Sequence, residues 1–267
     1  MQTHRFWRTA IVILNAEQTG KKEEFVVKIG IMQPYFFPYL GYWQLMNAVD
    51  RYVVYDDVNF INRGRINRNA ILIQQQAHNV NLILSGASQN KLINQIQVNA
   101  ETAVQAKLLR TIEMAYAKAP FFANVMPMIQ EIATQKEKNL AQYLFYSLHV
   151  IGEYLGITTE LILSSHLNKD CSLKGYKKII SICQLLDGTE YYNSINGVPL
   201  YAPHVAEFRE AGLELLFPKM RKITYPQYGN PFVENLSIID VMMFNSRQEC
   251  QNLLKEYDLM KGSAAAI

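Results

Sequence analysis

The segment that decides the fold is Lys28-Ile-Gly-Ile-Met-Gln-Pro-Tyr-Phe-Phe-Pro-Tyr-Leu-Gly-Tyr-Trp43. Its first six residues have the apolar, β-branched pattern of a strand. Pro34 and Pro38 fix φ and exclude a helix from the loop that follows. The apolar stretch 40–49 predicts a helix, and the β-branched and aromatic run 52–55 predicts the next strand. The segment therefore opens a β-loop-α-β unit.

Strand and helix patterns keep alternating on the C-terminal side of this unit. Two strand-like runs separated by polar residues predict a hairpin, at 70–74 and 80–84. Later strands are expected at 159–163, 189–192 and 213–217, and helices at 174–186, 203–211, 238–244 and 248–257. Because parallel neighbours require crossover connections, we predict an α/β fold with three layers and a mostly parallel, Rossmann-like sheet.

Three amphipathic helices interrupt this alternation, near 103–118, 121–134 and 139–155. They predict a helical segment, about 103–155, inserted into a single α/β domain that spans residues 27–260. Residues 1–26 show no clear period and are interpreted as an N-terminal appendage, and residues 261–267 as a tail.

Composition and charge exclude several classes of protein. A chain with 49% hydrophobic residues is not disordered, and a net charge of +3 is too small for a duplex DNA binder. Three cysteines without CxxC spacing argue against a disulfide framework and a zinc knuckle, and the dispersed histidines predict no metal site. No apolar run reaches the roughly 20 residues of a membrane span. We expect a soluble, cytoplasmic protein that binds no nucleic acid.

The polar residues are dominated by amides and tyrosines, with 20 Asn, 18 Gln and 16 Tyr. Such a mixture suits a neutral, hydroxyl-rich ligand such as a sugar. Nucleotide bias in the coding DNA is the alternative explanation.

The loop after the first strand is the first candidate binding segment, because ligands of parallel α/β sheets bind beyond the carboxyl ends of the strands. Its prolines and six aromatics predict a stiff aromatic rim. The candidate substrate-binding residues here are Gln33, Tyr35, Gly41 and Tyr42. The alternative is that the aromatics plug the end of the sheet as core.

Asp56 and Asp57 end the second strand and are the candidate catalytic residues. Neighbouring carboxylates push one pKa upward, which suits a general base, and they can also hold a hard cation. Neighbours in an extended chain point to opposite faces, so at most one is expected to serve the site. A turn or a helix cap is the alternative role.

The next loop, 59–69, combines arginines with amides. Guanidinium groups bind phosphate oxygens bidentately and amides orient hydroxyls, so the loop is expected to hold the diphosphate of a nucleotide-linked substrate. Its candidate binding residues are Asn59, Arg63, Asn67, Arg68 and Asn69. A solvated basic loop and a single-stranded RNA site are the alternatives.

Two later strands also end in polar residues, with Ser164 and Ser165 after one and Asn193 after the other. We expect them to contact phosphate or sugar, with helix capping as the alternative for the serines. No Gly-x-Ser-x-Gly elbow accompanies Ser165-His166, so a serine nucleophile is not predicted.

The chain resembles the WbqC-like proteins of bacterial surface-polysaccharide loci, over about residues 28–260. The resemblance is carried by six segments: 31–42, 55–60, 66–69, 87–92, 164–165 and 236–240. Such proteins usually begin close to Lys28, so residues 1–26 look like upstream sequence from a mis-assigned start. The resemblance implies a role in O-antigen or other surface-polysaccharide synthesis, but it transfers no catalytic residues.

The function that we infer from this resemblance is an N-acyl or aminoacyl transferase acting on the amine of a nucleotide-linked deoxyamino sugar. The donor of the transferred group would be an acyl or aminoacyl thioester, either free or attached to a carrier protein. Two alternatives stay open: a nucleotidylyltransferase-like ATP-dependent ligase, whose histidine pair is missing here, and a non-catalytic binding protein of the assembly complex.

Overall fold

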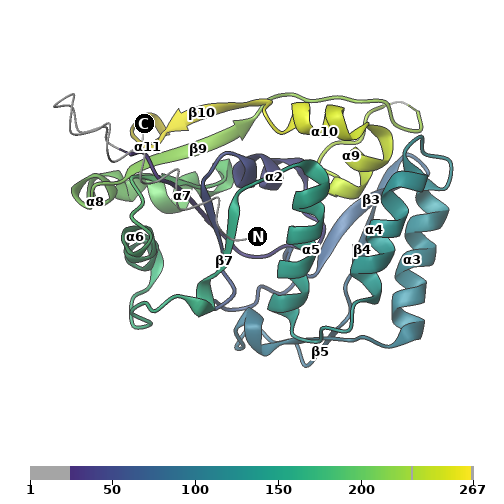
Figure 1. Ribbon diagram of the computed structural model, residues 1–267, viewed down its shortest axis with the longest axis horizontal. Helices are drawn as coiled ribbons and strands as arrows, with labels where there is room; N and C mark the ends of the chain where they lie inside the picture. The colour runs from purple at the N-terminus through teal and green to yellow at the C-terminus, as the bar shows by residue number, and fades with distance from the viewer. Residues whose placement is uncertain (1–24, 230, 266–267) are drawn as a thin grey trace, which may run out of the picture.

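The computed structural model describes residues 25–229 and 231–265 (Figure 1). Nearly all of the predicted appendage, 1–26, lies outside these residues. A six-stranded sheet forms the centre, in the order β10-β9-β8-β1-β2-β7. Its strands are β1 (Lys28–Met32), β2 (Arg51–Val54), β7 (Glu160–Leu163), β8 (Glu190–Tyr192), β9 (Glu214–Met220) and β10 (Tyr257–Lys261).

The sheet is parallel except at one edge, which confirms the prediction of a mostly parallel sheet. Strand β1 pairs in parallel with β2 and β8, β2 with β7, and β8 with β9, whereas β10 is antiparallel to β9. The chain adds β2 and β7 on one side of β1 and then returns to add β8 and β9 on the other. The order therefore reverses between β1 and β8, and ligands of open α/β sheets bind at such a point.

An apolar core covers each face of the sheet, because alternate strand residues point to opposite sides. In β2, Tyr52 and Val54 pack with helix α2 (Leu40–Asn47), while Val53 packs with α6 (Gly175–Leu185). Gly30 of β1 lies under Tyr52, whose ring would be only 3.0 Å from an added Cβ. The absence of a side chain at Gly30 therefore leaves room for the Tyr52 ring against β1.

The chain between β2 and β7 forms two hairpins and three helices, which stand side by side with α5 nearest the sheet (Figure 1). The hairpin predicted at 70–84 is confirmed, as β3 (Arg68–Ile73) paired with β4 (Gln76–Asn81). The second hairpin, β5 (Leu84–Ser85) with β6 (Gln97–Val98), brackets η1 (Ile93–Gln95). The helices are α3 (Thr102–Tyr116), α4 (Phe122–Thr134) and α5 (Leu140–Leu155).

The C-terminal part differs from the prediction in two places. The expected tail, 261–267, contains the last residue of β10 and a short helix at 262–265. The helix expected at 248–257 ends earlier, as α10 (Arg247–Leu253), and strand β10 begins at Tyr257. Residues 257–261 satisfy their backbone groups by antiparallel pairing with β9, a partner that a local pattern cannot reveal. The remaining elements are η2 (Ser164–His166), η3 (Ile195–Gly197), α7 (Val198–Tyr201), η4 (Ala202–His204), α8 (Val205–Glu210), α9 (Ile238–Phe244) and α11 (Gly262–Ala265).

Candidate functional site

Polar residues follow the carboxyl ends of four adjacent parallel strands. Gln33 follows β1, Asp56 and Asp57 follow β2, Ser164 and Ser165 follow β7, and Asn193 follows β8. Because β8, β1, β2 and β7 are neighbours in the sheet, these residues lie along one edge, around the point where the strand order reverses.

Asp56 is buried, 1% exposed, and its oxygens are occupied. The Ser165 amide donates to Oδ1 at 2.9 Å, and the Ser165 hydroxyl donates to Oδ2 at 2.6 Å. The Asn94 amide donates to Oδ2 at 3.4 Å. The hydrogen bonds of Asp56 therefore connect the end of β2 to η2, which directly follows β7.

Asp57 is the centre of an ionic cluster. Its Oδ2 lies 3.1 Å from Nζ of Lys169 and 3.1 Å from Nζ of Lys178. The two lysine side chains are only 3% and 10% exposed, against 13% for Asp57. Lys169 also donates to the Ser164 carbonyl, and Lys178 lies over the Tyr55 ring, 5.0 Å from its centroid. We call Asp57, Lys169 and Lys178 the Asp57 cluster.

The pKa of Asp57 lies below its ordinary value of 3.8. Burial acts in the opposite direction, but it is outweighed by the Ser164 hydroxyl and the two ammonium groups, which favour the charged carboxylate. Burial, with the Asp57 charge as second cause, raises the pKa of the Tyr55 hydroxyl. At neutral pH the cluster thus holds the ionised Asp57 carboxylate beside the neutral Tyr55 phenol.

Two buried polar atoms of this region keep hydrogen-bonding capacity. Oδ1 of Asp57 and Oγ of Ser164 have no hydrogen-bond partner among the described residues. Ser164 is near enough to lower the pKa of Asp57, yet the contact does not have hydrogen-bond geometry. Buried polar atoms are nearly always paired, and the Ser164 hydroxyl is the group that acts on the Asp57 carboxylate here.

The aromatic turn is part of the core, which corrects the expectation of an aromatic rim. Phe36, Phe37 and Trp43 are fully buried, and Tyr42 is 1% exposed with its hydroxyl donating to the Gln33 carbonyl. The segment before α9 covers the turn: Ser237 donates to the Phe37 carbonyl and the Ile238 amide donates to that of Pro38. Tyr42 therefore offers no surface to a ligand.

Other residues of the turn lie less deeply. Gln33 and Tyr35 are half-buried, and Tyr35 packs against Tyr42 with ring centroids 5.3 Å apart. Gly41 lies against the Tyr39 ring, 2.8 Å from where a Cβ would be, so the glycine permits this ring packing. Tyr35 and Tyr39 remain the aromatic side chains of the turn that are partly exposed.

The amides of the basic loop hold the chain itself. Asn69, 1% exposed, donates to the carbonyls of Phe36 and Phe37 and accepts from Arg65 at 2.7 Å. Asn59 donates to the Gln89 carbonyl and Asn67 to that of Leu82. Their amide groups are thus used to fix the loop and the turn.

The arginines of this loop lie apart from the carboxylates. Arg68 donates to the Arg63 carbonyl, and Arg63 is exposed with a left-handed backbone, φ 59°. In the described part of the chain, no hydrogen bond or ion pair joins Arg63, Arg65 or Arg68 to Asp56 or Asp57. Within the described residues, the side-chain hydrogen bonds of Arg65 and Asn69 therefore join the basic loop to the aromatic turn and not to the carboxylates.

The two lysines are the polar residues that the sequence interpretation missed. Lys178 is buried on the apolar side of α6 with Ile179 and Ile182, and a lysine within such an apolar stripe was the available signal. Lys169 lies in a loop, and nothing in the local sequence distinguishes it. Asn193 is buried, and its amide donates to the Tyr191 hydroxyl at 2.5 Å and to the Ile31 carbonyl at 3.4 Å, so it joins β8 to β1.

Asn69→Ala is expected to destabilise the fold by about 2 kcal/mol, because it removes two hydrogen bonds to the aromatic turn: the Phe36 carbonyl loses its side-chain donor, and the Phe37 carbonyl keeps only Ser237. Urea unfolding followed by circular dichroism measures the change. Asn59→Ala is the matched control: it removes one amide hydrogen bond at an exposed site and should cost well under half as much. Equal costs would contradict the role given to Asn69.

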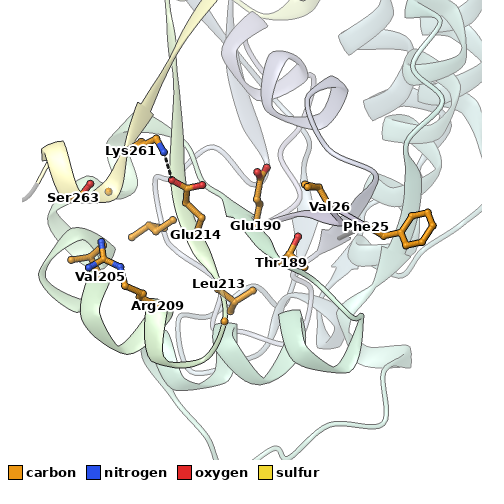
Figure 2. Close-up of a pocket in the computed structure, with 13 residues that line it drawn as sticks. Phe25, Val26, Thr189, Glu190, Val205, Arg209, Leu213, Glu214, Lys261 and Ser263 are labelled. Carbon is orange, nitrogen blue, oxygen red and sulfur yellow. Dashed lines mark ion pairs between the residues drawn. The ribbon is translucent and has the colours of Figure 1, made fainter. Parts of the chain in front are cut away.

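A cavity of about 640 Å³ lies at the opposite edge of the sheet (Figure 2). It is lined by Thr189 and Glu190 at the start of β8 and by Glu214 at the start of β9, which is paired with Lys261 at 2.6 Å. Since these are amino ends of parallel strands, the cavity is separate from the Asp57 cluster.

Within residues 25–229 and 231–265, no three acidic, His or Cys side chains gather as a metal site would need. No helix of the same residues has the length and apolarity to cross a bilayer.

Comparison with known proteins gives a family but no activity. The chain is 26% identical over 234 residues to "Uncharacterized protein Rv1507c" of Mycobacterium tuberculosis (strain ATCC 25618 / H37Rv), an alignment that covers 85% of this chain and 97% of that one. No solved structure matches. The model of the WbqC-like protein family matches residues 33–252, which include the aromatic turn, both carboxylates and both lysines, and the chain belongs to this family.

Proposed function

We propose that this protein is a transferase of surface-polysaccharide synthesis, which places an acyl or aminoacyl group on the amine of a nucleotide-linked deoxyamino sugar. The observation that carries the proposal is the Asp57 cluster: an ionised carboxylate held by two buried ammonium groups at the carboxyl end of β2. Membership of the WbqC-like family is consistent with such a role.

Asp57 is the proton acceptor of this proposal. Asp56 is the weaker candidate, because both of its oxygens accept hydrogen bonds from Ser165 or Asn94 and it is almost fully buried. Asp57 is ionised at neutral pH, and its buried Oδ1 has no hydrogen-bond partner among the described residues. A carboxylate in that state can receive a proton from the attacking sugar amine.

The lysines stabilise the charge that develops during transfer. When the amine nitrogen forms its bond to the carbonyl carbon, the carbonyl oxygen becomes an oxyanion, and a fixed ammonium group nearby lowers the energy of that state. The oxyanion collapses as the bond to the donor sulfur breaks, and the thiolate leaves and takes up a proton. Asp57 has the second task of holding Lys169 and Lys178 in place before the substrate arrives.

Ligand-dependent unfolding tests the proposal. A UDP- or dTDP-linked amino sugar at 100 times its dissociation constant should raise the free energy of unfolding by about 2.7 kcal/mol. The same nucleotide sugar with a series of acyl thioesters should release free thiol, measured with a thiol reagent. If no nucleotide sugar changes the melting temperature, the proposal fails.

A measurement of pyrophosphate beside the thiol-release assay distinguishes the transferase from the alternative, an ATP-dependent ligase. That activity requires release of pyrophosphate when ATP and a carboxylic acid are present and no thioester is added. Thiol release that does not require ATP supports the transferase activity. Pyrophosphate release would instead support the ligase activity and contradict the proposed transferase.

A further inference from the structure

A cavity of about 410 Å³ lies at the carboxyl end of β9, beside the beginning of α2. It is on the same edge of the sheet as the Asp57 cluster, but none of the side chains discussed for transfer lines it. Its lining comprises Tyr39, Leu40, Met220, Arg221, Lys222, Ile223, Tyr225, Phe232, Glu234, Asn235, Leu236 and Val241. The volume falls in the range of small-molecule sites.

Aromatic rings form part of this lining and are held in place. Tyr225 and Phe232 meet edge to face, with ring centroids 4.9 Å apart. The Tyr225 hydroxyl donates to the buried Asp240 carboxylate at 2.8 Å, which fixes the ring. Tyr39 is bridged through its backbone to Ser237. A flat ligand would thus meet rings that are already oriented, at little cost in side-chain entropy.

Two basic side chains, Arg221 and Lys222, and one acidic side chain, Glu234, line the cavity. Arg221 is paired with Glu256 and Asp258, whereas Lys222 has no ion pair within the described residues. Burial raises the pKa of the Tyr39 hydroxyl, and the charge of nearby Arg65 acts in the opposite direction. Glu234 is the acidic residue of the lining. A ligand with a flat apolar body and an anionic group matches these side chains.

We infer that this cavity binds the base and ribose of the nucleotide-linked sugar, an assignment that rests on the proposed function. The base would lie among Tyr39, Tyr225 and Phe232, and the diphosphate would leave the cavity past Lys222 and Arg65. This replaces the sequence expectation that Tyr35 and Tyr42 hold the base, since Tyr42 is buried in the core.

The distance between cavity and cluster agrees with such a ligand. Strands β9 and β2 are three positions apart in the sheet, with β8 and β1 between them. Neighbouring strands are about 4.8 Å apart, so the ends of β9 and β2 are about 14 Å apart along the edge. The cavity lies on the α2 face of the sheet and the Asp57 cluster on the α6 face, so the ligand would also pass over this edge. An extended nucleoside diphosphate has a similar length, and it would cross the sheet where the strand order reverses, between β8 and β1.

The test compares binding of UDP and dTDP, which lack the sugar, by isothermal titration calorimetry. Ile223→Trp fills the cavity, and Phe232→Ala removes a stacking surface. Each variant should weaken nucleotide binding roughly tenfold or more. Ile223→Trp does so by occupying the space of the base, and Phe232→Ala by removing base–aromatic stacking. Leu185→Trp, at an exposed site on α6, is the control and should bind like the wild type. Circular dichroism checks that each variant is folded.

Photo-crosslinking keeps the test independent of any variant. A 5-azido-uracil nucleotide should label peptides that contain residues 220–241 or Tyr39 of the wild-type protein. If nucleotides bind but both variants bind normally and the label lies elsewhere, the inference is overturned while the proposed function stands. If no nucleotide binds to the wild type at millimolar concentration, both fail.

Discussion

The Asp57→Asn variant is expected to lose acyl transfer by a factor of roughly 10² to 10⁴, the range found when a positioned proton acceptor is removed. Asparagine keeps the shape of the side chain but carries no charge and accepts no proton. It also leaves the two ammonium groups of Lys169 and Lys178 without their counter-ion, so their positions are expected to change. Initial rates of thiol release at saturating nucleotide sugar measure the loss.

Stability must be measured beside this rate, because removing one partner of a buried ion pair costs up to about 3–5 kcal/mol. The rate is therefore taken per folded molecule, with the folded fraction from circular dichroism. Asp187→Asn, at an exposed turn, is the control and should keep both rate and stability. Full activity in folded Asp57→Asn would refute the assignment of Asp57.

The pH dependence gives a second measure of Asp57. Because its pKa in the folded protein is lower than in the unfolded chain, the folded state binds the proton less readily. Its stabilising contribution is present above the ordinary value of 3.8 and is lost as the pH falls through the lowered pKa of the folded state. Between pH 5 and pH 2 the wild type should therefore lose more unfolding free energy than Asp57→Asn.

Replacement of Asp240 by alanine is expected to cost about 3–5 kcal/mol of stability, because three hydrogen-bond donors lose their buried acceptor. Asp240 is fully buried at the start of α9, and burial raises its pKa. It accepts hydrogen bonds from Tyr116 at 2.8 Å, Tyr225 at 2.8 Å and Gln227 at 2.7 Å. Alanine would leave three donors without an acceptor and would open a cavity.

Urea unfolding at pH 7 measures this loss. Tyr225→Phe is the matched control, because it removes a single hydrogen bond of the same carboxylate and should cost only about 1 kcal/mol. The network also joins α3, α9 and the loop at 225–227, so its loss should weaken nucleotide binding in the cavity beside Tyr225. A cost below 1 kcal/mol for Asp240→Ala would show that the three donors find other partners.

The sequence predicted the order of the main elements because their patterns are local. The strand at Lys28, the hairpin after residue 68 and the helix at 238–244 each follow from local periodicity. Strand β10 was missed, because its register depends on β9, more than 30 residues earlier in the chain.

The candidate site was predicted only in part. Position after a strand correctly indicated that Asp57, Ser164 and Ser165 lie on one edge of the sheet. It could not show that the aromatic turn is covered by the segment before α9, which lies about 200 residues further along the chain.

Residue types and local spacing thus determined which strands form and which polar groups follow them. The tertiary structure alone decided which of those groups meet: it brought Lys169 and Lys178 to Asp57 from segments more than 100 residues away and turned Tyr42 and Asn69 inward. The physical reason is that burial and charge pairing depend on distances in space, and two residues far apart in the chain acquire a common environment only when the sheet and its helices pack together.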